Sequence, residues 1–252
     1  MRRNIRAWRA LAGALLLLVA AAAGAQEGGE GSTRLLLTYV RVKPALQDTW
    51  LALQRSQVVP AMKKAGVKQY TVYETLIGDQ SEYVIVRPLP SFAEFDGPDL
   101  FDKALGARAA ATLRARLRDC IDGSHSSIEN SRDEFFLNPG PASALFVSRY
   151  RAMPGRAGDY MNFVRTEMMP LARRAQQNGT FAGWSVTTSV QGGEPNLITL
   201  NMFYNDFAPL DGPPPLAKTL GPAGVVEFLR KGAGLINQVG QSVLKRVPDL
   251  SY

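Results

Sequence analysis

One stretch of this sequence occurs twice. SFAEFDGPDLFDKALG (91–106) returns as DFAPLDGPPPLAKTLG (206–221). Eight of the sixteen positions are identical, whereas average residue usage would give about one. Two prolines, Pro44 and Pro60, likewise have counterparts in Pro154 and Pro170. The chain is therefore predicted to contain two copies of one module, which together fill most of its length.

Both copies show the same order of predicted elements. In the first copy, residues 35–43 are β-rich, and apolar residues recur at helical spacing over 45–65. Two alternating segments, 70–77 and 83–87, predict a hairpin, which is followed by a helix and a last strand (124–136). This order is that of the ferredoxin-like βαββαβ unit, whose sheet has helices on one face only. We predict an α+β fold in which the bare sheet faces of two tandem modules meet and enclose a barrel.

The N-terminal residues predict export. Residues 1–25 carry four arginines, an apolar run and a small-residue end, which is the pattern of a signal peptide cleaved after Ala25. The alternative is an uncleaved anchor, for which the apolar run is short. Residues 26–33 are a predicted flexible leader, followed by the first module (34–140) and the second (141–252). We expect the mature chain to be periplasmic or secreted, with no membrane segment.

Composition argues against several classes of function. The formal charge of +7 falls to +3 when the four arginines of the signal peptide leave, so no nucleic-acid partner is expected. Neither G-x-S-x-G, nor a phosphate-binding loop, nor G-x-G-x-x-G occurs in the sequence, which disfavours hydrolases, kinases and dehydrogenases. One histidine and one cysteine cannot form a familiar zinc site, so we expect no metal. The single cysteine, Cys120, is predicted to be a buried apolar residue.

The second module begins with a motif that carries a family resemblance. RYRAMPGRAGDYMNFVRTEMMP (149–170) resembles the first strand, proline-glycine turn and first helix of the dimeric α/β-barrel superfamily. That superfamily includes antibiotic-biosynthesis monooxygenases, EthD-like and NIPSNAP-like proteins, muconolactone isomerases and chlorite dismutases. The resemblance covers both modules and implies the barrel fold, in which a tandem pair in one chain would allow a monomer. It does not imply one function, because proteins of this fold differ widely in activity.

Strand alternation indicates which side chains face the barrel, since successive residues of a strand point to opposite faces. In the first module the helix-facing set is predicted to be Val40, Val42, Tyr70, Val72, Val84 and Val86. The barrel-facing set is predicted to be Tyr39, Arg41, Tyr73, Tyr83 and Arg87, with Arg149, Arg151, Ser185, Thr187, Thr199 and Asn201 in the second module. Arginines with tyrosines suit a small anionic or aromatic ligand. Alternatively, the arginines lie at the barrel ends or form structural ion pairs with Glu74, Glu82 and Glu129.

Three hypotheses for function follow. The first is an exported protein that binds a small molecule between the two modules. The second, implied by the resemblance, is a monooxygenase- or isomerase-like enzyme without a cofactor, with His125, Glu74 or Tyr73 as candidate catalytic residues. The third is a scaffold with a filled barrel. No cofactor is expected, although haem ligation by His125 stays open because a histidine ligates haem in some barrel relatives.

The repeated stretch also predicts local structure. Asp96 and its counterpart Asp211 are expected to accept a hydrogen bond at a helix start. Gly106 and Gly221 are expected to end the short helix that follows. Pro60 lies late in the first predicted helix and is expected to disturb its regular hydrogen bonding.

Overall fold

The computed structural model of the protein describes residues 31–252. The predicted signal peptide (1–25) and most of the predicted leader lie outside the described residues. The last two leader residues, Ser32 and Thr33, belong to the first strand, where Ser32 pairs with Arg132. The predicted leader is therefore too long at its C-terminal end, because these residues bond to a neighbouring strand.

The first half of the chain has the predicted order of strands and helices. Its elements are β1 (Ser32–Val42), η1 (Pro44–Leu46), α2 (Gln47–Leu53), η2 (Gln54–Val58), α3 (Val59–Lys64), β2 (Thr71–Ile77), β3 (Glu82–Pro88), η3 (Phe92–Asp96), α4 (Leu100–Leu105), α5 (Ala107–Cys120) and β4 (Ile121–Leu137). Helix α5 buries Cys120 at its end, as predicted.

The second half repeats this order. Its elements are β5 (Ala144–Ala152), α6 (Ala157–Phe163), η4 (Val164–Met168), α7 (Met169–Gln177), β6 (Gly183–Gln191), β7 (Leu197–Tyr204), η5 (Ala208–Asp211), α8 (Pro215–Gly232), β8 (Ile236–Arg246) and η6 (Pro248–Leu250). Residues 138–143 connect the halves, and the module boundary after residue 140 stays a prediction. None of the helices in the described part of the chain has the length and apolar character needed to cross a membrane.

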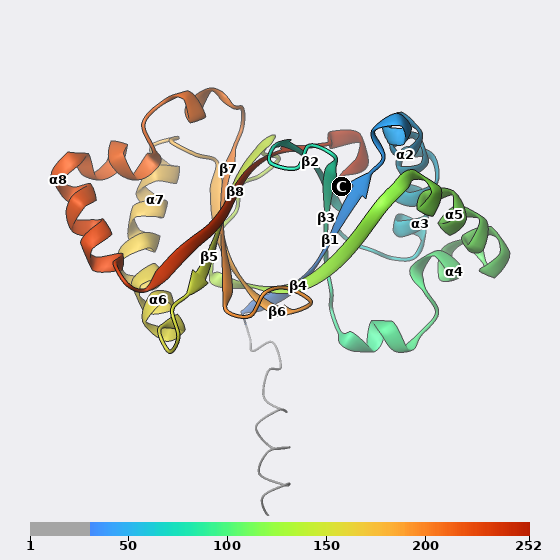
Figure 1. The fold of residues 1–252 in the computed structure, drawn as a ribbon, viewed down its shortest axis with the longest axis horizontal. Helices are drawn as coiled ribbons and strands as arrows, with labels where there is room; N and C mark the ends of the chain where they lie inside the picture. The colour runs from blue at the N-terminus through green and yellow to red at the C-terminus, as the bar shows by residue number, and fades with distance from the viewer. Residues whose placement is uncertain (1–30) are drawn as a thin grey trace, which may run out of the picture.

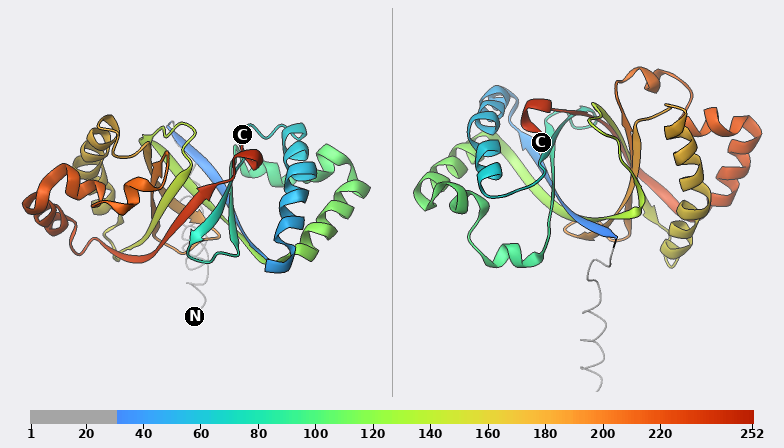
Figure 2. Two further views of the ribbon diagram at one scale, coloured as in Figure 1. Left: turned by 90° about the horizontal axis from the view of Figure 1, so that it is seen from above. Right: turned by 180° about the vertical axis from the view of Figure 1, so that it is seen from behind.

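The eight strands close into one barrel. Their order around it is β1-β3-β2-β8-β5-β7-β6-β4, and every neighbouring pair is antiparallel. The pairs β2–β8 and β4–β6 join the two halves. The helices of each half cover the outside of its own sheet, on opposite sides of the barrel (Figure 1; Figure 2). The predicted fold is confirmed, since each sheet packs one face on helices and encloses the barrel with the other.

Each half has its own apolar core between sheet and helices. Trp50 of α2 is at the centre of the first core and packs on Tyr83 with ring centroids 4.6 Å apart. Tyr160 of α6, the counterpart of Trp50 in the repeat, is buried in the second core. Four of the six residues predicted to face the helices are in the first core, namely Val40, Val42, Tyr70 and Val72.

The long helix of each half contains a π-helical segment at the same place in the repeat. These segments, η2 and η4, are each followed closely by a proline, Pro60 in the first half and Pro170 in the second. A proline has no N–H to donate to the carbonyl four residues before it, so the regular α-helical ladder is interrupted there. The predicted disturbance at Pro60 is confirmed and occurs in both halves.

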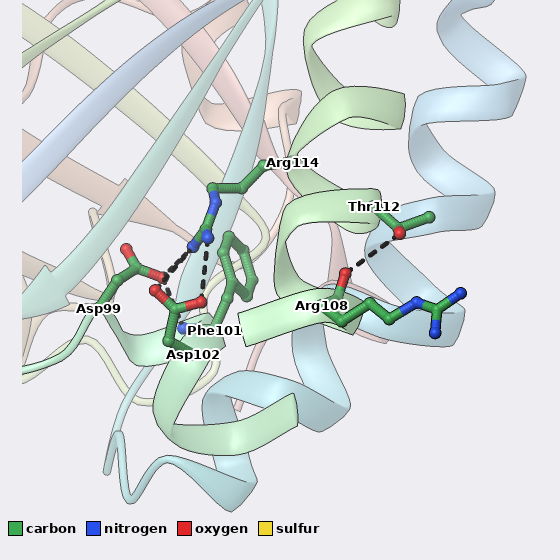
Figure 3. Close-up of polar contacts among 6 residues, drawn as sticks. All are labelled: Asp99, Phe101, Asp102, Arg108, Thr112 and Arg114. Carbon is green, nitrogen blue, oxygen red and sulfur yellow. Dashed lines mark hydrogen bonds and ion pairs between the residues drawn. The ribbon is translucent and has the colours of Figure 1, made fainter. Parts of the chain in front are cut away.

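The predicted caps of the repeated stretch are only partly correct. Asp96 ends η3, and the residue that caps α4 is instead Asp99, which accepts a hydrogen bond from Phe101 N at 2.8 Å (Figure 3). Asp99 and Asp102 also bind the Arg114 guanidinium, each at 2.9 Å. Asp211 likewise ends η5 and makes no side-chain cap. The helix begins after the Gly-Pro pair rather than before it, which places Asp96 one turn too early.

The two glycines of this stretch behave as predicted. Gly106 ends α4 at φ 80°, and Gly221 occupies the equivalent break in α8 at φ 67°. Side chains other than glycine rarely adopt such positive φ values. The positive φ angle therefore explains why glycine occupies this position in both halves.

Candidate functional site

The barrel encloses a cavity of about 480 Å³. Inward-facing residues of all eight strands line it, and its lining at one end includes Gln69, Arg246, Tyr252 and the connecting segment 138–142. At the other end the lining reaches Tyr39, Glu129 and Arg149. The barrel interior is thus large enough to hold a small molecule, and it is not filled by side chains.

The cavity lining divides into two chemically different sides. One side, here called the polar wall, runs over the adjacent strands β4, β6 and β7 and consists of Glu129, Ser131, Ser185, Thr187, Thr199 and Asn201. The other side, the apolar wall, runs from β1 to β5 through β3, β2 and β8 and includes Leu37, Tyr39, Tyr73, Val84, Val86, Leu145, Val147 and Leu244. A ligand with one apolar and one polar edge would match this division.

Glu129 and Arg149 supply the charge at the end of the cavity away from segment 138–142. Glu129 is only 3% exposed, and its Oε2 accepts a hydrogen bond from the Thr187 hydroxyl. Arg149 places its guanidinium carbon 5.8 Å from the centre of the Tyr39 ring and donates to Ser242 Oγ at 3.5 Å. Neither charged side chain forms an ion pair within residues 31–252. Both charges therefore stay available to a bound molecule.

Burial changes the acidity of the groups at this end. Burial raises the pKa of the Glu129 carboxyl, and the Thr187 hydrogen bond and the Arg149 charge only partly oppose this. Burial also raises the pKa of the Tyr39 phenol, helped by the negative charge of Glu129. On the apolar wall, burial raises the pKa of Tyr73 to about 12. The tyrosines are therefore neutral at physiological pH, and Glu129 is a stronger proton acceptor than a solvated carboxylate.

Glu129 and Arg149 both have uncharged counterparts in the other half of the repeat. Strand pairing equates Tyr39 with Arg149, because Tyr39 pairs with Val84 and Arg149 pairs with Thr199. By the same pairing, Glu129 opposite Leu35 corresponds to Leu244 opposite Leu145. The duplicated chain thus carries charge at one of two equivalent places, which favours a single ligand in one orientation.

Solved structures share this architecture. A proposed monooxygenase from Lactobacillus acidophilus superposes with a TM-score of 0.59 at 9% identity, covering 88% of this chain and 96% of its own. An anthrone oxidase-like protein gives 0.58 at 11% identity, with 87% and 92% covered. The chain has the dimeric α/β-barrel fold. A mutant chlorite dismutase from Candidatus Nitrospira defluvii matches the same barrel with a TM-score of 0.51 at 10% identity, covering 87% and 93%.

The similarity to these solved proteins is one of three-dimensional structure. The sequence matches no family model and no curated protein. Identities as low as those of the solved structures show the fold and leave the activity to be argued from the site.

Four predicted site residues line the cavity of this α/β barrel. Tyr39 and Tyr73 lie on the apolar wall, Asn201 lies on the polar wall, and Arg149 lies between the walls on β5. Asn201 donates to Ser185 Oγ at 3.2 Å, which orders that part of the polar wall. The predicted positions of Ser185, Thr187 and Thr199 are also confirmed.

Two predicted site residues face the wrong way for the barrel cavity. Tyr83 is buried against the helices, where its hydroxyl accepts a hydrogen bond from Gln47 at 2.7 Å. Arg87 lies on the same outer face and binds Glu94 at 2.5 Å. The predicted faces of β3 are therefore reversed, and Val84 and Val86 face the cavity instead of the helices.

The cause of this reversal is one extra residue in the second hairpin. The turn between β2 and β3 covers 78–81, whereas the turn between β6 and β7 covers 192–196. If the two halves of the repeat are aligned without a gap through this turn, β3 is matched to β7 one residue out of register. Because side chains alternate, a slip of one residue exchanges the two faces.

Arg41 and Arg151 were predicted to enter the cavity but are paired outside its lining. Arg41 is 57% exposed and binds Asp79 at 2.9 Å, and Arg151 is 52% exposed and binds Glu194. Each is the last residue but one of its strand, and each lies at the barrel end away from segment 138–142. The alternative prediction, that the arginines lie at the barrel ends in structural ion pairs, is correct for Arg41 and Arg151. Their partners are Asp79 and Glu194 instead of the predicted Glu74, Glu82 and Glu129.

Two of the three candidate catalytic residues are not in the cavity lining. Glu74 points to the outer face of β2 and binds Lys245 at 3.1 Å. His125 is exposed, and its ring stacks on Tyr39 with centroids 4.6 Å apart and planes 5° apart. Tyr73 alone of the three candidates lines the cavity.

The residues present do not fit a haem in this cavity. His125 is the single histidine of the sequence, and it is outside the cavity lining. The tyrosines that line the cavity are kept protonated by burial, which disfavours their binding to iron as phenolates. Within residues 31–252 no group of three histidine, cysteine, aspartate or glutamate side chains could hold a metal ion.

The sequence prediction missed Glu129 as a site residue. The sequence predicts Glu129 only as a structural partner for arginines, because one acidic residue in the polar run SHSSIENSRDE has no distinguishing local signal. Its partner Thr187 lies on β6 of the other half and meets it only when β4 and β6 pair. In the structure, Glu129 has the same alternation phase in β4 as His125, which pairs with the inward residue Tyr39, and this pairing puts Glu129 on the cavity face.

A pH-dependent gain in stability is expected when Glu129 is replaced with glutamine. The folded protein holds the Glu129 proton more tightly than the unfolded chain, so the free energy of unfolding falls as pH rises from the unfolded pKa of about 4.3 through the raised folded value. Glu129→Gln removes this loss. Its melting temperature should equal that of the wild type near pH 4 and exceed it at pH 8, by roughly 2–4 °C for each kcal/mol gained. Thermal unfolding followed by circular dichroism measures both values.

The matched control for this prediction is Glu74→Gln, on the outer face of β2. It should show no difference from the wild type that grows with pH. A Glu129→Gln difference of the same size at pH 4 and pH 8 would contradict the assignment of a buried, proton-retaining carboxyl.

Proposed function

We propose that the protein binds one small molecule inside the barrel, with a flat apolar body and an oxygen that is anionic or becomes anionic on binding. The observation that carries this proposal is the cavity of about 480 Å³ between a polar and an apolar wall. The apolar wall would pack the body of the ligand through Tyr39, Tyr73 and neighbouring aliphatic residues. The Arg149 guanidinium would bind the oxygen, since it makes no ion pair of its own in the described chain.

An enzyme is the second candidate, and Glu129 is the observation that favours it. A buried carboxylate and a guanidinium that lacks an ion-pair partner in the described chain, both in the lining of one cavity, can move protons on a bound molecule. The structural neighbours include a proposed monooxygenase and an anthrone oxidase-like protein, so enzymatic activity is compatible with the fold. The third hypothesis, a scaffold with a filled barrel, is disfavoured by the volume of the cavity.

We also propose that the protein is exported and works as a monomer. Export is supported by the signal-peptide pattern of residues 1–25. A monomer is supported by the closed barrel, because the second module occupies the place that a partner subunit takes in single-module barrels. The intact mass of protein secreted from its full-length gene tests both, since it reports cleavage after Ala25 and, under native conditions, the number of chains.

Binding is tested with 2-naphthoate, a flat aromatic carboxylate, titrated against the tyrosine and tryptophan fluorescence of the protein. We expect saturable binding by the wild type. Thr199→Phe fills the cavity from β7, so its affinity should fall by about tenfold or more. The control is Thr188→Phe, which changes the neighbouring strand β6 on its outer face and should keep the wild-type affinity.

Two outcomes would count against the proposal. A wild type that shows no saturable signal would exclude this ligand class. Equal affinities of Thr199→Phe and the wild type would place the bound naphthoate outside the barrel.

A further inference from the structure

We propose that the barrel holds an elongated ligand with an acidic group at each end, one bound by Arg149 and the other by Arg246. The ligand class is a rigid aromatic dicarboxylate, or an aromatic carboxylate with a second anionic group at its far end. This inference rests on the proposed binding function and adds a second anion subsite to it, at the cavity end near segment 138–142. Arg246 is not among the arginines that the sequence predicts to face the cavity.

Arg246 lies at the end of the cavity opposite Arg149. It is the last residue of β8, where its backbone N–H donates to the Ser143 carbonyl oxygen at 2.8 Å, beside segment 138–142. Arg246 lines the cavity and is half-buried, and its side chain has neither an ion pair nor a hydrogen bond within residues 31–252. A guanidinium has five N–H donors, so an unpaired one in a cavity wall can bind an anion.

Tyr73 supplies a second donor at the Arg246 end. The two residues are partners across the β2–β8 ladder, and both line the cavity. The Tyr73 hydroxyl makes no hydrogen bond within the described residues. Burial raises the pKa of Tyr73 to about 12, although the Arg246 charge opposes this, so the hydroxyl keeps its proton at neutral pH. A guanidinium and a neutral phenol on neighbouring strands can donate to the two oxygens of one carboxylate.

The spacing of the two arginines favours a long ligand. Arg149 donates to Ser242 Oγ of β8 at 3.5 Å, so its guanidinium lies at the level of Ser242. Ser242 and Arg246 are four residues apart on β8, which corresponds to about 13 Å of extended strand. The cavity lining between the two arginines is apolar and includes Leu145, Val147 and Leu244. Acidic groups at both ends of a rigid apolar body match this arrangement.

The acidic residues of the lining leave both arginines available. Asp133, at the Arg246 end, is exposed and forms no ion pair in the described chain, so water screens its charge. Glu129, at the Arg149 end, is buried, and burial raises the pKa of its carboxyl. Glu129 therefore takes up a proton more readily than a solvated carboxylate when an anion binds beside it. Two unpaired guanidinium groups thus remain for the two negative charges of the ligand.

The test compares three ligands by isothermal titration calorimetry. Biphenyl-4,4′-dicarboxylate has an acid at each end, biphenyl-4-carboxylate lacks the far acid, and biphenyl-3,4-dicarboxylate has both acids at one end. We expect the wild type to bind the 4,4′-diacid about ten- to hundredfold more tightly than either of the others. Arg246→Met should reduce this preference to a few-fold. Arg41→Met, which removes an exposed arginine outside the lining, should keep it.

The outcomes separate the second subsite from the binding function. Binding of the monoacid without a preference for the 4,4′-diacid would overturn the second subsite and leave the binding function intact. Binding of none of the three ligands by the wild type would overturn both. A preference that survives in Arg246→Met would contradict the role of Arg246. If Arg246→Met fails to fold, Tyr73→Phe provides the test, because it keeps the ring and removes only the hydroxyl. It should lower the preference about three- to tenfold, and an unchanged preference would contradict the inference.

Discussion

Replacing Trp50 with alanine is expected to destabilise the protein by about 3–5 kcal/mol. Trp50 is 1% exposed and packs on Tyr83, so its removal leaves a large hole between the first sheet and its helices. For a chain of this size the loss corresponds to a fall of roughly 6–20 °C in the melting temperature. Urea unfolding at pH 7 measures the change, and a loss below about 1 kcal/mol would mean that this core does not support the fold.

The matched substitution in the second half is Tyr160→Ala, at the equivalent place in the repeat. It should destabilise the protein by a similar amount and shift the same single unfolding transition. The two halves share the β2–β8 and β4–β6 ladders, so neither sheet keeps both its edges paired when the other unfolds. A second transition that stays at the wild-type position would contradict this coupling.

Replacing Gly183 with alanine is expected to destabilise the protein by about 1–3 kcal/mol and to weaken ligand binding. A β-carbon at this position would lie 2.5 Å from the Leu137 carbonyl oxygen and 2.5 Å from Pro139 Cα. Both are backbone atoms, so the chain itself has to move. The displaced segment, 138–142, lines the cavity, and the affinity for 2-naphthoate should fall with stability.

The control for Gly183→Ala is Gly158→Ala in helix α6. A β-carbon there meets no atom within 4 Å, and alanine favours the helix by up to about 1 kcal/mol over glycine. Thermal unfolding and naphthoate titration of both variants measure the effects. If Gly183→Ala matches the wild type in both, the tight contact between β6 and segment 138–142 does not matter to the site.

The architecture was accessible from the sequence because its signals are local and occur twice. The matched stretches at 91–106 and 206–221 revealed the duplication, and strand and helix periodicity revealed the order of elements within each copy. Prolines at the same place in each copy predicted an irregular helix, and the structure has a π-helical segment there in both halves. Agreement between two copies acts as an internal check that a single module would not offer.

Only part of the cavity lining could be predicted from the sequence. Tyr39, Tyr73, Arg149 and Asn201 were placed correctly because alternation within one strand is a local property. The prediction assigned the two faces of β3 the wrong way round because the second hairpin turn is one residue longer than the first. Nothing in the sequence of either turn shows where the extra residue belongs. Arg41 and Arg151 have the alternation phase of cavity-facing residues, but they lie too near the strand ends to reach the cavity. Ion pairs with acidic residues hold both side chains outside it.

The duplicated βαββαβ modules, and hence the barrel, can be read from the sequence alone, because repeats and periodicities persist in any window that contains them. The pairing of Glu129 with Thr187, the position of Arg149 beside them and the contrast between the two walls emerge only in the closed barrel. These groups come from strands of both halves that are far apart in the chain. Their meeting depends on the register of β4 against β6 and of β5 against β8, which barrel closure sets through hydrogen bonding and packing of all eight strands together.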